Sequence, residues 1–193
     1  MYLARILYPI EVLGPGKRVG IWFAGCDKRC EGCSNPELWE FDRRYLTTPE
    51  TVAHLVGEIA KAHKIDGFTL TGGDPLCQPE EVKALIPYLL PYSHDILIYT
   101  GYRLEALGEL PRAAVLIDGA YRRELNFSQG LIGSANQRVI LLDERYRVRY
   151  RRYLKGLYGK TPLIQNFESA DGHLSIGIHR PDFLRVGKSK RKE

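Results

Sequence analysis

The stretch RVGIWFAGCDKRCEGC, residues 18–33, joins a strand pattern directly to three closely spaced cysteines. Its first half is apolar and rich in the β-branched and aromatic residues that favour buried strands. Cys26, Cys30 and Cys33 follow at intervals of four and three residues. We therefore predict a strand over residues 18–25 that ends in a loop carrying three thiols.

Strand and helix patterns alternate along the rest of the chain. Helices are predicted over residues 48–63 and 79–90, where apolar residues recur on one helical face. Thr48 suits the cap of the first helix and Pro49 suits its first turn. Further elements are predicted as strands over 67–73, 95–101, 113–119 and 137–142, and as a short helix over 102–110. This alternation predicts an α/β fold with a mostly parallel sheet.

The last quarter of the chain has a different character. Residues 145–160 interleave five arginines and two lysines with four tyrosines, which is typical of a helix with a solvated basic face. Residues 163–178 alternate apolar and polar side chains around the turn dipeptide Asp171-Gly172, which predicts a β-hairpin. We divide the chain into a core, a basic extension with the hairpin packed on that core, and a disordered basic tail: residues 1–144, 145–186 and 187–193.

Composition limits the class of protein. The 193 residues are 44% hydrophobic and 26% charged with a net charge of +5, which is ordinary for one globular domain. We find no apolar run long enough to span a membrane and no signal-peptide pattern, so we expect a cytoplasmic protein without a membrane partner. The reducing cytoplasm argues against disulfides among the four cysteines and leaves metal binding or catalysis.

Unusual loops follow four of the predicted strands. The cysteines follow the first strand, and the sequence GGDP, residues 72–75, follows the next. Residues 99–102 and 117–119 end the two strands after that. Parallel α/β proteins bind ligands at the carboxyl ends of their strands. We therefore expect these loops to meet at one edge of the sheet and to form an active site there.

Three thiols on one loop are compatible with two kinds of metal site. Thiolates are soft ligands that suit iron–sulfur clusters and zinc. Three cysteines hold three irons of a cubane cluster and leave the fourth iron free for chemistry. A closed zinc site would instead add Cys77 as the fourth ligand. The spacing favours the cluster, and Cys77 is otherwise a small apolar residue beside a helix.

The pattern CxxxCxxC followed by LTGGDP resembles the radical S-adenosylmethionine (SAM) enzymes. More closely, it resembles the family that activates the anaerobic ribonucleotide reductase, a glycyl-radical enzyme. The segments that carry this resemblance occur in order over residues 13–18, 25–39, 70–76, 99–102, 115–121 and 133–140.

This resemblance implies a partial (β/α) barrel of the radical SAM type, followed here by the C-terminal hairpin extension. It also implies a [4Fe-4S] cluster on Cys26, Cys30 and Cys33, with S-adenosyl-L-methionine on the open iron. One electron from the cluster would cleave SAM to methionine and a 5′-deoxyadenosyl radical. That radical would take a hydrogen atom from a glycine of a partner enzyme, which a laterally open barrel would admit.

The resemblance further assigns SAM contacts near the cysteines and after the second strand. Gly72, Gly73 and Asp74 match the element that receives the SAM amino group, because glycine permits close backbone approach and a carboxylate accepts from an ammonium. Gly32 and Ser34 flank the last cysteine and are expected on the adenine side.

Four later residues complete the predicted cofactor site. Asp118, at a strand end, is expected to hold ribose hydroxyls or the peptide. Asn136, Gln137 and Arg138 supply amide and guanidinium donors for the SAM carboxylate or ribose. The alternative for all four is a structural role.

The predicted partners are a glycyl-radical enzyme as protein substrate and a flavodoxin- or ferredoxin-type electron donor, which the basic face within residues 145–160 would receive. Two other functions stay open. One is a radical SAM enzyme that acts on a small molecule, nucleotide or peptide. The other is a zinc- or cluster-stabilised nucleic-acid-binding module that uses the Arg/Tyr stretch, although we do not expect nucleic acid to be the partner.

Overall fold

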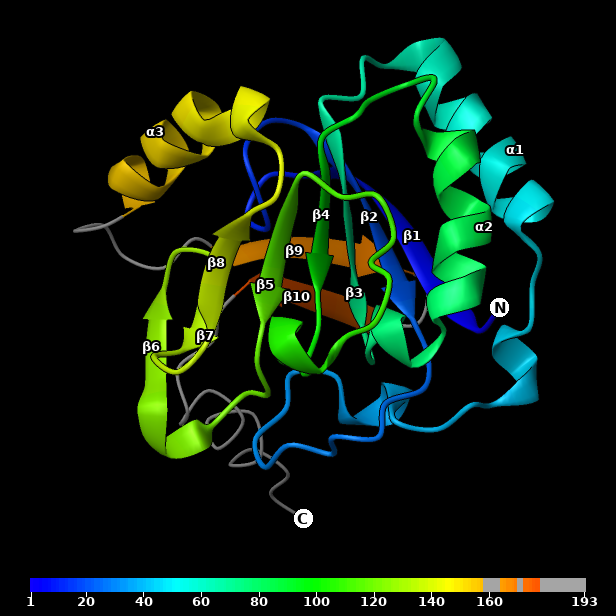
Figure 1. Cartoon of the computed structure of the whole chain (residues 1–193). Helices are drawn as coiled ribbons and strands as arrows, with labels where there is room; N and C mark the ends of the chain where they lie inside the picture. The colour runs from blue at the N-terminus through cyan, green and yellow to red at the C-terminus, as the bar shows by residue number, and fades with distance from the viewer. Residues whose placement is uncertain (158–163, 170–171, 178–193) are drawn as a thin grey trace.

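A computed structural model describes residues 1–157, 164–169 and 172–177 of the chain. Its centre is a six-stranded sheet in the order β1-β2-β3-β4-β5-β8 (Figure 1). Strands β2 to β5 run parallel, and β1 and β8 pair antiparallel at the two edges. The strands span Leu3–Ile10, Arg18–Phe23, Gly67–Gly72, Ile96–Tyr99, Val115–Asp118 and Arg138–Leu141. The predicted α/β fold with a mostly parallel sheet is confirmed, while closure as a radical SAM barrel stays a prediction.

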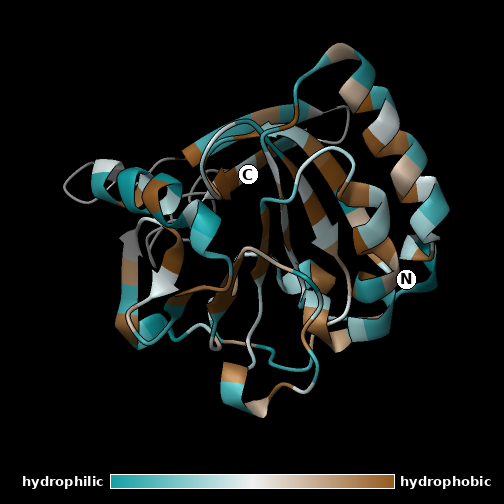
Figure 2. Cartoon of the chain, turned by 45° about the horizontal axis from the view of Figure 1, so that its top comes forward, coloured by the Kyte–Doolittle hydropathy of each residue, from teal (hydrophilic) through white to brown (hydrophobic). Residues whose placement is uncertain are grey.

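Helices α1 (Pro49–Ala62) and α2 (Pro79–Leu89) cover one face of this sheet. Both begin at a proline, as predicted, and the Thr48 hydroxyl accepts from the Thr51 backbone N–H at 3.3 Å to cap α1. Apolar residues of both helices and of β2 to β4 share one buried cluster. Figure 2 shows the predominantly hydrophobic strands between more hydrophilic outer surfaces.

Some elements differ from the sequence-based prediction. The helix expected over 102–110 is a single 3-10 turn, Leu104–Ala106, because the backbone of Leu107 is extended (φ −90°, ψ 142°) and ends the helical run. Strand β1 and the small β6–β7 pair (Asn126–Gln129 and Ile132–Ser134) were not predicted. The strand over 137–142 forms as β8, but it is antiparallel to β5.

The described parts of the C-terminal extension, a helix and a hairpin, lie on the other face of the sheet (Figure 1). Helix α3 (Arg147–Leu157) packs Tyr150 against β4 and β5. The predicted hairpin forms as β9 (Ile164–Ser169) and β10 (Gly172–Gly177). Its central turn and the tail over 187–193 lie outside the described residues, so the proposed division of the chain into core, extension and tail stays a prediction. No helix in the described part of the chain is long and apolar enough to cross a bilayer.

A buried ion pair fixes the edge where the parallel strands begin. Arg18, the first residue of β2, and Asp95, just before β4, have fully buried side chains, and Nη2 of Arg18 lies 3.2 Å from Oδ1 of Asp95. Arg18 also donates to the Thr69 hydroxyl at 2.8 Å and to the Phe68 carbonyl. The Tyr150 hydroxyl donates to Asp95 at 2.7 Å. Helix α3 is therefore tied to the strand starts, which is the edge opposite the cysteines.

Replacing Asp95 with alanine should lower the free energy of unfolding by about 3 kcal/mol, because the buried Arg18 guanidinium then loses its counter-ion. Chemical denaturation followed by circular dichroism measures this loss. Glu58→Ala removes the exposed ion pair with Lys61 and should leave the midpoint unchanged. A wild-type midpoint for Asp95→Ala would mean that carbonyl groups alone satisfy Arg18.

Candidate functional site

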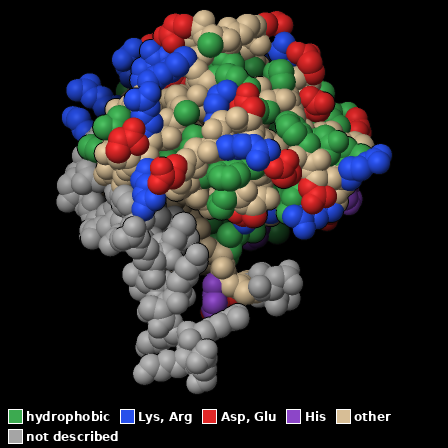
Figure 3. All heavy atoms as spheres, turned by 90° about the horizontal axis from the view of Figure 1, so that it is seen from below, with side chains coloured by type: hydrophobic (Ala, Val, Ile, Leu, Met, Phe, Trp, Pro, Cys, Tyr) green, Lys and Arg blue, Asp and Glu red, His purple; other side chains and the backbone are tan. Residues whose placement is uncertain are grey.

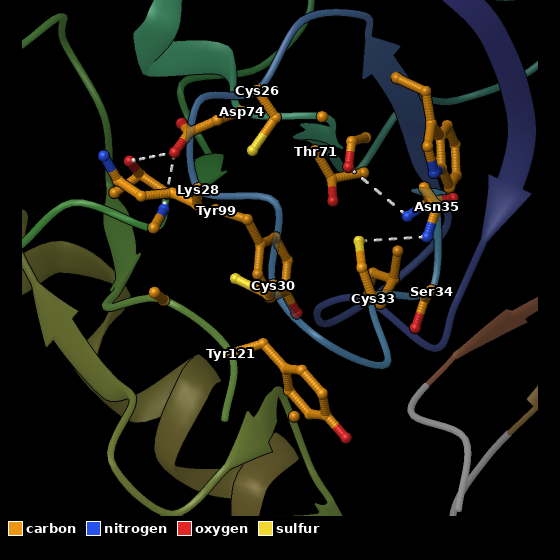
Figure 4. Close-up of a pocket in the computed structure, with 18 of the residues that line it drawn as sticks. Cys26, Lys28, Cys30, Cys33, Ser34, Asn35, Thr71, Asp74, Tyr99 and Tyr121 are labelled. Atoms are coloured by element: carbon orange, nitrogen blue, oxygen red, sulfur yellow. Dashed lines mark hydrogen bonds between the residues drawn. The ribbon is translucent and has the colours of Figure 1, made fainter. Parts of the chain in front are cut away.

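The three cysteines lie where the prediction put them, in a loop that leaves the carboxyl end of β2. All three are half-buried and line one pocket together with the loops after β3, β4 and β5. Figure 4 shows their sulfur atoms around the same open space. The start of the loop is closed by backbone hydrogen bonds from Gly25 to the Leu38 carbonyl and from Cys26 to the Trp39 carbonyl, at 2.8 and 2.9 Å.

Backbone amides surround the sulfur atoms. The Asn35 N–H donates to Cys33 Sγ at 3.4 Å, and the amides of Lys28 and Arg29 donate to the sulfur of Cys26. Burial raises the pKa of the Cys26 thiol to about 11, against the opposing effect of these amides. Burial also raises the pKa of Cys30. The thiols of Cys26 and Cys30 are therefore protonated at neutral pH, and metal binding must displace their protons.

The donor set fits an iron–sulfur cluster. Cysteine thiolates hold such clusters, and hydrogen bonds to the sulfurs tune them. The irons of a cubane lie at separate corners, so its cysteine ligands surround a shared space, as the three sulfur atoms do in Figure 4. Within the described ranges, no group of three or more His, Cys, Asp or Glu side chains is arranged to hold one metal ion.

Cys77 lies beside this loop rather than among the residues that line the pocket. Its Sγ lies 3.6 Å from Oδ1 of Asp27 and 3.7 Å from the Tyr102 hydroxyl. Tyr102 in turn donates to Asp27 at 2.5 Å. The thiol therefore belongs to a polar cluster next to the cysteine loop, and this contact was not predicted from the sequence.

The glycines after β3 are required by close backbone packing. A Cβ on Gly73 would lie 2.5 Å from the Gly25 carbonyl oxygen, and one on Gly72 would lie 2.4 Å from that of Phe23. Gly72 also has a φ of +105°, which side chains rarely adopt. The N–H groups of Gly73 and Asp74 donate to the carbonyls of Phe23 and Gly25 at 2.8 and 2.9 Å. The GGDP turn thus holds the start of the cysteine loop.

Asp74 lines the pocket from a buried position, with 1% of its surface exposed. Its carboxylate accepts hydrogen bonds from the backbone N–H groups of Leu76 and Gly101, at 2.9 and 2.7 Å, and from the Thr100 hydroxyl at 3.1 Å. Burial raises the pKa of Asp74 to about 6, although these hydrogen bonds act in the opposite direction. Asp74 therefore joins the loops after β3 and β4 and presents a carboxyl that responds to nearby charge.

Asp118 and Arg138 pair with each other and are not among the pocket-lining residues. Arg138 also donates to Glu105 at 2.8 Å, and Arg103 lies 3.3 Å from Asp118. Burial opposes ionisation of Asp118, but the hydrogen bonds from Arg138 and Leu104 outweigh it and lower the pKa of Asp118. Both side chains therefore belong to an ion-pair network outside the pocket lining.

The amides of Asn136 and Gln137 are engaged with nearby backbone. Gln137 lines the pocket, but its Oε1 accepts from the Gly133 N–H at 2.8 Å and its Nε2 donates to the Gly119 carbonyl at 2.9 Å. Asn136 Nδ2 donates to the Ala120 carbonyl at 2.8 Å. These side chains shape the turn that forms one wall. Their predicted contact with SAM stays a prediction.

The two residues predicted on the adenine side of SAM, Gly32 and Ser34, differ in whether they line the pocket. Ser34 lines the pocket, whereas Gly32 does not. Gly32 has a φ of +72°, which accounts for a glycine there independently of any ligand.

Sequence reasoning missed several pocket residues. Lys28, inside the cysteine loop, places its Nζ 3.4 Å from the centre of the Tyr102 ring and 2.8 Å from Asp27. Thr71, Tyr99 and Tyr121 also face the pocket (Figure 4). Side-chain alternation along β3 and β4 was the available signal for two of them. Figure 3 views this strand-end edge from below and shows side chains of both charge signs on it.

Comparisons with known proteins agree with this site. The sequence model of the 4Fe-4S single cluster domain family matches residues 12–140. The anaerobic ribonucleoside-triphosphate reductase-activating protein of Enterobacteria phage T4 is 38% identical over 69% of this chain and 90% of its own. Proteins of the same name from Haemophilus influenzae and Escherichia coli K12 are 34% and 30% identical, over 67% and 68% of this chain and 92% and 94% of theirs.

The chain belongs to the anaerobic ribonucleoside-triphosphate reductase-activating protein family. The resemblance drawn from its motifs is thereby confirmed. The segment that matches the 4Fe-4S domain contains the cysteine loop, the GGDP turn and every other predicted site residue. Helix α3 and the β9–β10 hairpin follow that segment.

Gly73→Ala should destabilise the protein by about 2 kcal/mol or more and misplace the cysteine loop, because its new Cβ meets backbone that cannot move aside. The denaturation midpoint and the iron bound per chain after anaerobic reconstitution measure the two effects. Gly108→Ala is the matched control, since its Cβ has nothing within 4 Å. Full iron content in Gly73→Ala would contradict this role of the turn.

Asp74 should give the cluster-free protein a distinct pH dependence. The pKa of Asp74 is about 6 in the folded chain against an ordinary 3.8, so the folded state keeps this proton over a range where the unfolded state has lost it. The contribution of Asp74 to the free energy of unfolding is therefore fully present at low pH, and it is lost as the pH rises through about 6.

The comparison protein for this prediction is Asp74→Asn, which does not titrate at this position. Between about pH 4 and pH 7, its free energy of unfolding should gain about 2 kcal/mol relative to wild type. Denaturant titrations at several pH values measure the difference. Parallel pH curves for the two proteins would contradict it.

Proposed function

We propose that this chain generates a glycyl radical on an anaerobic ribonucleoside-triphosphate reductase by reductive cleavage of SAM. The observation that carries the proposal is three thiols around one pocket at the strand-end edge, in a chain of the activating-protein family. Cys26, Cys30 and Cys33 are the proposed ligands of a [4Fe-4S] cluster. When bound, the cluster would supply the electron that splits SAM into methionine and a 5′-deoxyadenosyl radical, and this radical would take a hydrogen atom from the partner's glycine.

The chain's own contribution is to hold, orient and shield these reactants. The amides of Asn35, Lys28 and Arg29 stabilise thiolate charge at the sulfurs they contact. The GGDP turn keeps the cysteine loop at the end of β2. A closed, preordered pocket reduces side reactions of a reactive intermediate with water.

Asp74 is the proposed acceptor for the SAM amino group. Its buried carboxyl already has an elevated pKa, and an ammonium brought next to it would favour the ionised form. Gly72 and Gly73, next to Asp74, and Ser34, next to Cys33, are further proposed SAM contacts, since all three line the pocket. Asp118, Asn136, Gln137 and Arg138 are proposed to act through the wall that they stabilise, with Gln137 the member that lines the pocket.

A flavodoxin- or ferredoxin-type protein is the proposed electron donor, and the cytoplasm is the expected compartment. The basic face of α3 lies beside the amino-terminal ends of the parallel strands. Arg149 on this face donates to the Pro15 carbonyl and forms an ion pair with Asp95. That face is therefore at the edge away from the cysteines, and the donor's docking site on this chain is not assigned to it.

The test uses protein reconstituted anaerobically with iron and sulfide. Wild type with SAM and dithionite should release methionine and 5′-deoxyadenosine. Electron paramagnetic resonance should show a glycyl doublet on the reductase mixed with it. Cys26→Ser, Cys30→Ser and Cys33→Ser should each lose at least about a hundredfold in both signals, since each removes a ligand.

Cys77→Ser is the matched control, because Cys77 lies next to the loop but outside the pocket lining. It should keep the iron content and the activity of wild type. Deoxyadenosine release without a glycyl doublet on the reductase would point to another substrate. Loss of iron in Cys77→Ser would point to a fourth cysteine ligand and would overturn the proposed ligand set.

A further inference from the structure

The C-terminal hairpin forms part of the pocket that holds the cysteines. Leu174, Ser175, Ile176 and Gly177, consecutive residues of β10, line this pocket with the cysteine loop. These residues follow the segment that matches the 4Fe-4S domain, which ends at residue 140. In the described part of the chain, one wall of the pocket is thus built from outside the matched domain.

The hairpin is anchored at this position. Ile176 is 5% exposed and belongs to the same apolar cluster as Leu13 and Trp22, which also line the pocket. Gln165 of β9 donates to the Pro9 carbonyl at 2.7 Å and accepts from the Glu11 N–H at 3.1 Å. The contacts that hold the hairpin against the core are therefore continuous with the pocket surface.

We propose that β10 is a wall of the active site that keeps water out of the pocket and sets the space open to the glycine-bearing segment of the partner. This role rests on the proposed function. Aliphatic side chains such as Leu174 and Ile176 give water no hydrogen-bonding partner. Excluding water from a site with a reactive intermediate prevents its loss to side reactions.

The hairpin also limits the direction of approach. It lies over the face of the sheet opposite α1 and α2, where a laterally open barrel would admit a partner (Figure 1). The cysteine loop and Tyr121 line the pocket from the strand-end edge, where they follow β2 and β5. The glycine-bearing segment is therefore expected to enter at that edge and to meet β10 as the opposite wall.

The test compares Ile176→Ala with wild type in the full-length, cluster-loaded protein. With SAM, dithionite and the reductase, the glycyl radical formed per 5′-deoxyadenosine released should fall about tenfold, because the reactants lose their position and shielding. Because the ratio is taken per 5′-deoxyadenosine released, a change in SAM cleavage alone would not alter it. His173→Ala is the control, since this neighbouring side chain is 80% exposed and does not line the pocket.

A second measurement does not depend on the proposed function. Both tryptophans of the chain, Trp22 and Trp39, line the pocket, so acrylamide quenching of their fluorescence reports its access to solvent. Quenching should rise about twofold in Ile176→Ala and not in His173→Ala. If the wild-type protein formed no glycyl radical on the reductase, the proposed function would be wrong. The quenching result would still decide whether β10 shields the pocket from solvent.

Unchanged quenching and an unchanged radical ratio in Ile176→Ala would overturn the proposal. Equal effects in His173→Ala would overturn it too, because they would not be specific to the wall. If Ile176→Ala loses iron or secondary structure, Leu174→Ala at the partly buried position of the same wall takes its place with the same expectations. Ile176→Val, which keeps most of the side chain, should restore wild-type values.

Discussion

The contact between two backbone segments, at the ends of β2 and β3, is the constraint on which the site depends. Gly72 and Gly73 come so close to Phe23 and Gly25 that no side chain fits between them. Hydrogen bonds from Gly73 and Asp74 then fix the first residues of the cysteine loop. Without this contact, three cysteines on a loop would have no defined direction. With it, their sulfurs surround one space at the carboxyl edge of the sheet.

Different interactions stabilise the two ends of the sheet. At the strand starts, a fully buried ion pair joins β2, the segment before β4 and, through Tyr150, helix α3. Such a pair is costly to bury and costly to break, so it favours one arrangement of these elements. At the strand ends, glycines and half-buried thiols leave room for a ligand. The C-terminal extension connects both ends, because α3 packs at the first and the hairpin reaches the second.

How far the site could be predicted depended on the residue type. Cysteine spacing is local, so the sequence alone predicted that Cys26, Cys30 and Cys33 share one loop after β2, and strand order predicted the GGDP turn at the same edge; the structure places both there. The side chains of Asp118 and Arg138 were harder to interpret, because a polar residue at a strand end serves a ligand or a neighbour equally well. Here they pair with each other. Lys28 and Tyr121 were not predicted as pocket residues, because a sequence pattern does not determine the direction in which a loop side chain points.

Sequence by itself determined the mostly parallel sheet, the two helices α1 and α2, the thiol loop and the membership of an activating-protein family, because periodicity, spacing and motifs can be recognised along the chain. Tertiary structure alone decided that the glycines serve backbone packing, that the amides of residues 136 and 137 bind the chain itself, and that β10 becomes a wall of the pocket. Residues 172–177 are far from the cysteines along the chain. The burial of Ile176 in the cluster of Leu13 and Trp22, together with the hydrogen bonds of Gln165, brings them there.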